Sequence, residues 1–475
     1  MYKQTFMVAV VAVALSLPAA AGAVTEAEIK DLREQLQQMK REYEQRIDAL
    51  EKRLQQAEGA AGKAQTSSSN AQKAATRAEA VASSANARPA GESAFNPGIS
   101  LILNGVMANL SQDPARHQIT GFMPTGGEVG PGKRGLSLAE SELVFSANID
   151  PNFRGTLIAA LAPDNTVSVE EGYIQSLGMS HGLGFKAGRF YSSVGYLNEV
   201  HPHAWDFVDA PLTNKVFLGK QLADDGVQLK WVAPTDTFVE LGAEIGRGRA
   251  FPGSDRDKNG VGAGNLFARL GGDIGASTAW RLGLSHLRTT AQNRSYEDFA
   301  SNGVAVNNSF NGGSRLWALD GVLKWSPNGN STQTNFKLQG EYFRRSEDGN
   351  LTYDTAAASA AGTQTGTLRS AQSGWYAQGV YQFMPRWRAG YRHDRLNSGS
   401  VRLGLVESGA LTAADVPIYA AHRATRDSLM FDFSASEFSR LRLQFASDKS
   451  RPGVTDKQVF LQYIMSLGAH GAHKF

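Results

Sequence analysis

From about Ile99 onward, apolar and polar residues alternate along segments of roughly ten residues. One segment reads Phe-Lys-Leu-Gln-Gly-Glu-Tyr-Phe from Phe336 to Phe343, and another reads Arg-Leu-Arg-Leu-Gln-Phe from Arg440 to Phe445. A period of two gives a β-strand with one apolar face and one polar face. We therefore predict an all-β fold for this part of the chain. The predicted strands are 99–110, 135–149, 153–162, 167–178, 182–190, 225–233, 236–248, 261–272, 276–288, 313–326, 332–346, 372–384, 386–395, 426–436, 438–449 and 456–475.

The connections between these strands alternate in length. Every second connection is a tight turn, such as Asp150-Pro151-Asn152 or Pro327-Asn328-Gly329, and most of the others are long. The long connections are 111–134, 191–224, 289–312, 347–371 and 396–425. A water-soluble sandwich also has alternating strands, but short turns at one end and long loops at the other are typical of outer-membrane barrels. We predict a transmembrane antiparallel β-barrel of about 16 strands over residues 98–475.

Three segments precede the predicted barrel. Residues 1–23 have a short basic start, an apolar core and an Ala-Gly-Ala end, which predicts a secretory signal peptide, with an uncleaved anchor helix as the alternative. Residues 24–58 are rich in charged residues and contain no Gly, and apolar residues recur every three or four positions from Ile29 to Leu54. This pattern predicts an α-helical coiled-coil stalk. Such a stalk self-associates, as a homotrimer or a dimer; a single helix packed on the body is the alternative. Residues 59–97 form an Ala/Ser-rich linker.

Composition narrows the class of protein further. The 48 Lys and Arg nearly balance the 45 Asp and Glu of this 475-residue chain, which argues against a nucleic-acid partner. The absence of Cys excludes disulfides and thiol chemistry, and no apolar run beyond the N-terminus could form a spanning helix. The last predicted strand ends at Phe475, which resembles the assembly signal of bacterial outer-membrane proteins. We expect localisation in the bacterial outer membrane, with the stalk in the periplasm and membrane lipid as a partner.

The polar face of the strands should line the barrel interior. Sixteen strands are too many for side chains to fill, so we expect an aqueous channel. Charges facing lipid at mid-membrane cost a few kcal/mol, so charged strand residues should point inward. The acidic candidates are Glu140, Glu142, Glu240, Glu244, Glu341 and Asp432, and the basic ones are Arg269, Arg281, Lys337, Arg345, Arg386, Arg388, Arg392, Arg440 and Arg442. The acidic candidates lie mostly early in the chain and the basic ones late, which predicts an electric field across the pore that selects solutes by charge. Alternatively, these residues are only solvated parts of the wall.

The third external loop, 191–224, follows 111–134 and the short connection 163–166 at the same end, and it is too apolar for a freely solvated loop. We expect it to fold into the barrel and narrow it. The candidate constriction residues are Glu199, His201, His203, Trp205, Asp206 and Asp209. His201, His203 and Asp206 offer imidazole and carboxylate groups that suit zinc or a similar divalent ion. The alternative is that the two histidines hydrogen-bond within a packed loop. A weaker zinc candidate is His470 with His473, near the C-terminus.

Several sequence runs carry a resemblance to a known family. Residues 197–211 read Leu-Asn-Glu-Val-His-Pro-His-Ala-Trp-Asp-Phe-Val-Asp-Ala-Pro, and related runs begin at Asn96, Leu138 and Lys337. They resemble proteobacterial porin-like outer-membrane proteins, whose members are often labelled zinc-regulated TonB-dependent outer membrane receptors. The stalk before a barrel is also similar to trimeric dicarboxylate-type and phosphate-selective porins. A TonB-dependent receptor needs a plug domain and a barrel of about 22 strands, and residues 24–97 are too short and polar for that plug.

We therefore predict a porin: a passive channel for small hydrophilic solutes, charged ones included. The alternatives are a zinc-associated receptor or metal-uptake protein, and a structural tether of the outer membrane. We predict no enzyme, because no Gly-x-Ser-x-Gly motif occurs and His393 and Asp394 would point to opposite faces of a strand. We expect no resident cofactor, and zinc is the candidate for a bound or transported ion.

Overall fold

The computed structural model describes residues 98–126, 129–255, 257 and 259–468, together with Gln37, Asp48 and Lys52, which are helical and exposed. The predicted signal peptide and linker lie outside the described residues, as does the stalk apart from those three positions. His470 and His473 also lie outside them. Among the described residues, no helix is both long and apolar enough to cross a bilayer.

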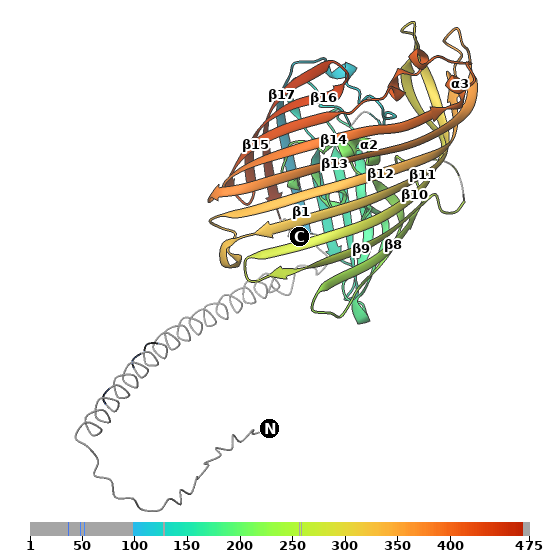
Figure 1. Ribbon diagram of the computed structural model, residues 1–475. Helices are drawn as coiled ribbons and strands as arrows, with labels where there is room; N and C mark the ends of the chain where they lie inside the picture. The colour runs from blue at the N-terminus through green and yellow to red at the C-terminus, as the bar shows by residue number, and fades with distance from the viewer. Residues whose placement is uncertain are drawn as a thin grey trace, which may run out of the picture. The chain divides into compact units, whose positions relative to one another are not determined.

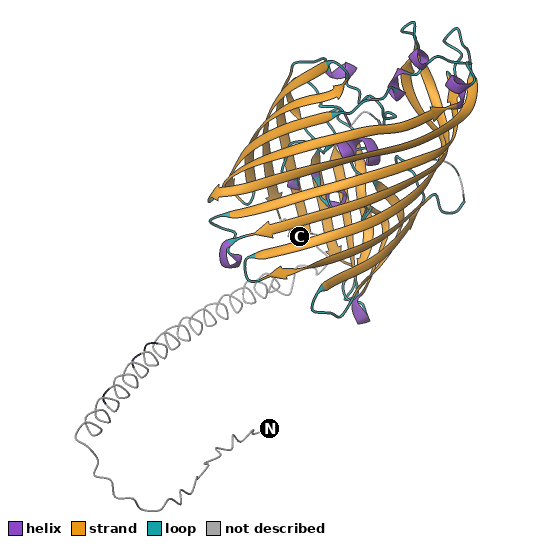
Figure 2. Ribbon diagram, viewed as in Figure 1, coloured by secondary structure: helices purple, strands orange, loops and turns teal. Residues whose placement is uncertain are grey.

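Residues 98–468 form a single antiparallel sheet (Figure 2). Its strands are β1 (Gly98–Leu110), β2 (Gly135–Leu138), β3 (Ser141–Asn148), β4 (Phe153–Leu161), β5 (Val167–Ser176), β6 (Leu183–Tyr191), β7 (Ala223–Val232), β8 (Phe238–Gly246), β9 (Ala263–Ile274), β10 (Thr278–Phe299), β11 (Ala305–Trp325), β12 (Asn335–Tyr353), β13 (Gln364–Met384), β14 (Trp387–Leu403), β15 (Thr425–Ser436), β16 (Ser439–Arg451) and β17 (Val454–Gly468).

The sheet closes on itself. β1 pairs with β17 on one side and with both β2 and β3 on the other. β2 and β3 are two halves of one strand, interrupted at Ala139 and Glu140, so the barrel has sixteen strands. Closure leaves no sheet edge, which is the condition for a β-structure to satisfy its backbone hydrogen bonds in lipid. The predicted all-β antiparallel barrel and its strand number are confirmed.

The two ends of the barrel differ as the sequence predicts. At one end, here called the turn end, the strands are joined by segments such as 233–237, 275–277 and 385–386. The opposite end, the loop end, carries the long connections 111–134, 192–222, 247–262 and 404–424. These loops include the short helices η1 (Pro114–Arg116), α3 (Gly404–Glu407), η7 (Ala413–Asp415) and η8 (Pro417–Tyr419).

Three predicted loops are shorter than expected. The predictions 289–312, 347–371 and 396–425 are wrong in extent because β10 to β14 are 17 to 22 residues long. About 9–11 residues suffice to cross a bilayer, so these strands continue beyond that length towards α3 (Figure 1). There they enclose an apolar core with loop 404–424, which includes Phe310, Leu351, Leu405 and Ile418. The extensions are rich in Ser, Thr, Asn and Gly, which hid their strand character.

The two faces of the barrel wall have opposite polarity. Large apolar side chains exposed on the outside include Leu284, Leu319, Leu338 and Leu461, and exposed aromatic residues near the turn end include Trp325, Tyr381 and Trp387. On the inside, Arg345, Arg392, Arg426 and Arg442 are at most 1% exposed. An apolar outer band with aromatic residues at its border is the surface that a bilayer solvates best.

Loops fill part of the barrel interior at the loop end. Loops 111–134 and 192–222 contribute an apolar cluster that packs against inward-facing residues of β10, β11, β12 and β14. Its buried members are Ile119, Phe122, Val129, Val194, Leu212, Val216, Phe217, Leu218, Leu222, Leu287, Leu316, Ala318, Phe343, Leu396 and Ala424. Loops rather than strand side chains therefore occupy part of the interior at this end.

The apolar outer face of the barrel leads to a testable prediction for Leu319. This residue is 54% exposed on β11, six residues before the turn-end Trp325, and therefore near the middle of a bilayer-crossing segment. Leu319→Arg should destabilise the folded protein by about 2–4 kcal/mol, because an arginine then faces lipid. Guanidinium-dependent unfolding from lipid vesicles measures this. Leu319→Ala is the control, and an equal cost for the two variants would argue against a lipid-facing position.

Candidate functional site

The connection between β6 and β7, residues 192–222, lies inside the barrel and is called the inner loop. It contains η4 (Leu197–Glu199), η5 (Pro202–Ala204) and α2 (Leu212–Leu218). Its backbone accepts hydrogen bonds from Arg345 of β12 and Arg442 of β16 and donates one to Asp394 of β14. Contacts with strands on different sides of the barrel hold the loop within the interior, where Figure 1 shows α2.

Gly195 lies near the start of the inner loop, where the chain turns into the barrel. Its φ of 71° lies in the left-handed region, and an added Cβ would meet Glu341 Oε1 at 2.5 Å. Glu341 of β12 uses this close approach to accept hydrogen bonds from the backbone N–H groups of Tyr196 and Leu197. A side chain at position 195 would therefore disrupt the anchor that turns the loop inward.

One side of the inner loop faces carboxylates, which we call the acidic wall: Glu140, Glu142, Glu170 and Glu171, from the β2–β3 break, β3 and β5. His201 Nε2 lies 2.9 Å from Glu171 Oε2, and His203 Nδ1 lies 2.9 Å from Glu142 Oε1. Burial disfavours a charged imidazole, but the surrounding Glu142, Glu170 and Glu171 raise the pKa of His201 well above its ordinary value. The histidines therefore lie against the wall whose charge is opposite to theirs when protonated.

The other side faces a basic wall, formed by Lys337, Arg388, Arg392, Arg426 and Arg442 of β12 and β14 to β16. Asp206 lies 3.0 Å from Lys337 Nζ and 3.0 Å from Arg388 Nη1. Asp209 pairs with Arg392 at 3.0 Å, with Lys215 at 3.2 Å and with Arg426.

Burial disfavours the two carboxylates of the inner loop, yet the facing cations keep both ionised. Lys337 and Arg388 lower the pKa of Asp206. Arg426, Lys215 and Arg392 hold the pKa of Asp209 well below its ordinary value. Each aspartate is therefore an anion that compensates buried positive charge.

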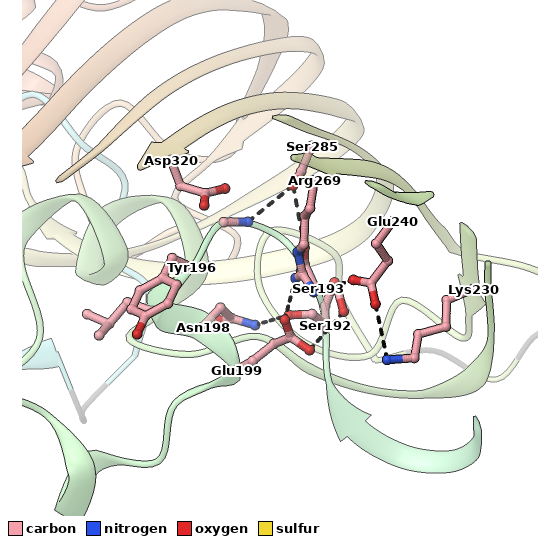
Figure 3. Close-up of polar contacts among 12 residues, drawn as sticks. Ser192, Ser193, Tyr196, Asn198, Glu199, Lys230, Glu240, Arg269, Ser285 and Asp320 are labelled. Atoms are coloured by element: carbon pink, nitrogen blue, oxygen red, sulfur yellow. Dashed lines mark hydrogen bonds and ion pairs between the residues drawn. The ribbon is translucent and has the colours of Figure 1, made fainter. Parts of the chain in front are cut away.

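A third set of charges lies where the inner loop leaves β6 (Figure 3). Glu199 of the loop pairs with Arg269 of β9, whose Nη1 lies 2.9 Å from Glu240 Oε1 of β8. Lys230 of β7 lies 3.2 Å from the other oxygen of Glu240. The four residues form an alternating row of charges from the loop to the wall.

Most of the predicted lining residues lie on the inner face of the barrel. Buried ones are Glu142, Glu240, Glu244, Arg269, Glu341, Arg345, Arg392, Asp432 and Arg442, and partly buried ones are Glu140, Arg281, Lys337, Arg388 and Arg440. Arg386 differs: it is exposed, with φ 72°, in the turn before β14, so the predicted strand start was one residue early.

Among the candidate constriction residues, the predicted grouping of His201, His203 and Asp206 was wrong. Asp206 engages the basic wall, and Glu142 of β3 takes its place beside the two histidines. Asp209 also pairs with the basic wall, whereas Glu199 pairs with Arg269 of β9. Trp205 is buried and donates to the carbonyl of Val200. The spacing of these three residues in the sequence could not show that Asp206 contacts a different wall, because the short helix η5 lies between His201 and Asp206.

Sequence reasoning missed some of the interior residues. Asp320, Asp394 and Arg426 share the parity of the predicted inward positions, so strand alternation could have found them. Glu170 and Glu171 are adjacent and could not both be assigned inward by alternation. A β-bulge explains them: Ile158 pairs with Glu171 and Ala159 with Val169, which leaves Glu170 as the extra residue.

A cavity of about 370 Å³ near the turn end has as many acidic as basic lining residues, Glu199, Glu240 and Asp273 against Lys230, Arg269 and Arg281. Two further cavities near this end have more basic than acidic lining residues. One, of about 410 Å³, is lined by His203, Arg386, Glu437 and Arg440 among others. The second, of about 580 Å³, is lined by Asp273, Lys324, Lys337 and Arg388 among others. Water-accessible space therefore borders the inner loop on this side.

No protein-family model matches this chain. An uncharacterized protein of Aquifex aeolicus (strain VF5) is 29% identical to it over 423 residues, which cover 82% of this chain and 81% of that protein. Among solved structures, the trimer form of OmpT, an outer membrane protein of Vibrio cholerae, is similar over 78% of this chain and 99% of its own, with a TM-score of 0.48 and 10% identity.

Two further solved structures are similar to this chain. OprB of Pseudomonas putida covers 78% of this chain and 94% of its own at 13% identity, with a TM-score of 0.48. The outer membrane channel DcaP of Acinetobacter baumannii covers 78% of this chain and 97% of its own at 10% identity, with a TM-score of 0.42.

The contacts of Asp209 predict its role in stability. Asp209→Asn should destabilise the protein by about 3–5 kcal/mol, because buried Lys215 loses the carboxylate with which it pairs. Arg392 and Arg426 lose the same carboxylate and keep only Asp394 and Asp448. Equilibrium unfolding in detergent measures the change. Asp427→Asn is the matched control, since that half-exposed carboxylate contacts His393 and should cost at most about 1 kcal/mol. Equal costs would contradict the anchoring role.

Proposed function

We propose that this protein is a porin, a passive aqueous channel of the bacterial outer membrane for small hydrophilic solutes. The observation that carries the proposal is the closed sixteen-stranded barrel whose outer face is apolar and whose inner face is charged. A wall with this polarity is stable only if lipid lies outside and polar groups or water lie inside.

The inner loop is the proposed constriction. It is tied to the acidic wall by His201 and His203 and to the basic wall by Asp206 and Asp209. Ion pairs at both of its sides favour a fixed loop over a mobile one, since leaving a buried charge unpaired is costly. Together with the apolar cluster around Phe217, this arrangement favours a narrow path and a small conductance.

Two of the cavities at the turn end, those of about 410 and 580 Å³, favour anionic solutes. Their charged lining groups other than His203 are the basic Lys324, Lys337, Arg386, Arg388 and Arg440, against the acidic Asp273 and Glu437. Nε and Nη1 of Arg440 are buried and make no hydrogen bond in the described structure. Such donors can be satisfied by a passing carboxylate or phosphate group.

The heptad-like stripe in residues 24–58 supports assembly through the stalk, and we propose a homotrimer on that basis.

Planar-bilayer recording tests the channel. The full-length protein, folded in detergent and added to a lipid bilayer, should produce stepwise conductance, because its interior is polar and borders water-filled cavities. Its folded state is checked beforehand by circular dichroism and by the mobility shift on heating. Folded protein that inserts but never conducts would overturn the proposal in favour of a structural tether.

Reversal potentials in asymmetric salt test the charge preference. Anions should permeate better than cations, and Arg440→Gln should lower that ratio roughly twofold to threefold, because a charge about 7 Å from an ion in water is worth about 0.6 kcal/mol. Arg423→Gln, at an exposed site of loop 404–424, is the control and should leave the ratio unchanged. A cation preference in the wild type would contradict the assignment.

A further inference from the structure

The contact between the inner loop and the acidic wall contains four buried polar atoms that meet no hydrogen-bond geometry in the described structure, three carboxylate oxygens and one imidazole nitrogen. They are Glu140 Oε1, Glu142 Oε2, Glu170 Oε2 and His201 Nδ1. All four are buried in the described structure, and the side chain of Glu142 is only 1% exposed. Without an ion, a proton on His201 Nδ1 compensates Glu142 Oε2 and Glu170 Oε2, which lie 3.2 and 3.6 Å from it, while Glu140 Oε1 makes no hydrogen bond. Buried carboxylate oxygens without full hydrogen bonding are costly, so a cation that replaces this proton would be stabilised here.

The other polar atom of each side chain is held by a partner. Lys220 Nζ lies 2.9 Å from Glu140 Oε2, and Tyr191 donates its hydroxyl to Glu170 Oε1. His203 Nδ1 holds Glu142 Oε1, and Glu171 holds His201 Nε2, each at 2.9 Å. Metal-binding histidines and carboxylates are oriented in this manner, with one atom directed at the ion and the other fixed by a neighbour.

The separations between the unsatisfied atoms suit coordination of one ion. His201 Nδ1 lies 3.2 Å from Glu142 Oε2 and 3.6 Å from Glu170 Oε2. One carboxylate oxygen from each of Glu140, Glu142 and Glu170 lies within 4.8 Å of the other two, and Glu142 also belongs to a second such group, with His201 and His203. Two ligands at about 2.1 Å from a tetrahedral ion are about 3.4 Å apart, which matches the first two distances.

Two irregularities in neighbouring strands bring these groups together. Glu170 is the extra residue of the bulge in β5, so it joins Glu171 at the same site. In the β2–β3 strand, Ala139, Glu140 and Ser141 lie opposite only Leu103 and Asn104 of β1, which is a second one-residue excess. Bulges re-aim side chains at functional sites, and here both occur beside the unsatisfied atoms.

We propose that Glu140, Glu142, Glu170 and His201 bind one divalent transition-metal ion, which links the inner loop to the barrel wall. Three carboxylates carry more negative charge than Lys220 offsets, and one imidazole among oxygen ligands suits Zn²⁺ or Mn²⁺ better than Ca²⁺ or Mg²⁺. The set replaces the sequence-based triad, because His203 supports Glu142 and Asp206 faces the basic wall. The four proposed ligands are different residues from the basic groups that line the cavities. A protein that binds no metal ion could therefore still conduct as proposed.

Zinc binding to the full-length protein tests the site. The background carries His470→Ala and His473→Ala, which removes the other histidine pair singled out in the sequence. After treatment with a chelator and dialysis, calorimetry with Zn²⁺ should show one site per chain, and saturating zinc should raise the unfolding temperature, since an ion bound only by the folded state stabilises it. No binding by the folded protein would overturn the proposal.

Variants locate the ion. Glu142→Gln and His201→Gln should each weaken zinc binding at least tenfold, while His422→Ala, in loop 404–424, should leave it unchanged. Binding that persists in both site variants would overturn the assignment. If the variants fail to fold, X-ray absorption of the zinc-loaded background protein decides instead. One imidazole among oxygen ligands supports the site, and two or more imidazoles contradict it.

Discussion

The interior of this barrel depends on opposite charges meeting across the inner loop. The acidic wall and the basic wall each place several charges in a buried setting, where an unpaired ion would cost several kcal/mol. The inner loop supplies groups of opposite charge to both walls. His201 and His203 lie against the carboxylates, and Asp206 and Asp209 lie against the guanidinium and ammonium groups. Its position is therefore set by electrostatic complementarity as well as by apolar packing.

Closure of the sheet creates the compartment in which this complementarity operates. β1 pairs with β17, so backbone groups are satisfied in the wall, and side chains alternate between its outer and inner faces except at bulges such as the one at Glu170. The apolar cluster around Phe122, Phe217 and Phe343 then fills part of the loop end.

Much of the fold could be predicted from the sequence, because a period of two is a local signal. Phe336 to Phe343 shows which face of β12 is apolar, and the turns at Pro327 and Pro385 mark where strands end. The apolar content of residues 191–224 also indicated that the loop would be buried.

Other features depend on contacts that no local pattern encodes. Glu170 joins Glu171 only through a bulge, and Asp206 meets Lys337 from 131 residues away. The extended ends of β10 to β14 were missed because their stability comes from the core with loop 404–424 rather than from an apolar outer face.

Cross-linking tests the location of the inner loop most directly. The chain has no Cys, so a Val208→Cys/Gln444→Cys pair can be joined by a short bifunctional thiol reagent. The backbone N–H of Val208 donates to Gln444 Oε1 at 2.8 Å, so the folded protein in lipid should cross-link efficiently. A Val208→Cys/Phe445→Cys pair should not, because Phe445 is exposed on the outer face. Equal cross-linking of the two pairs, or none in either, would contradict a loop fixed inside the barrel.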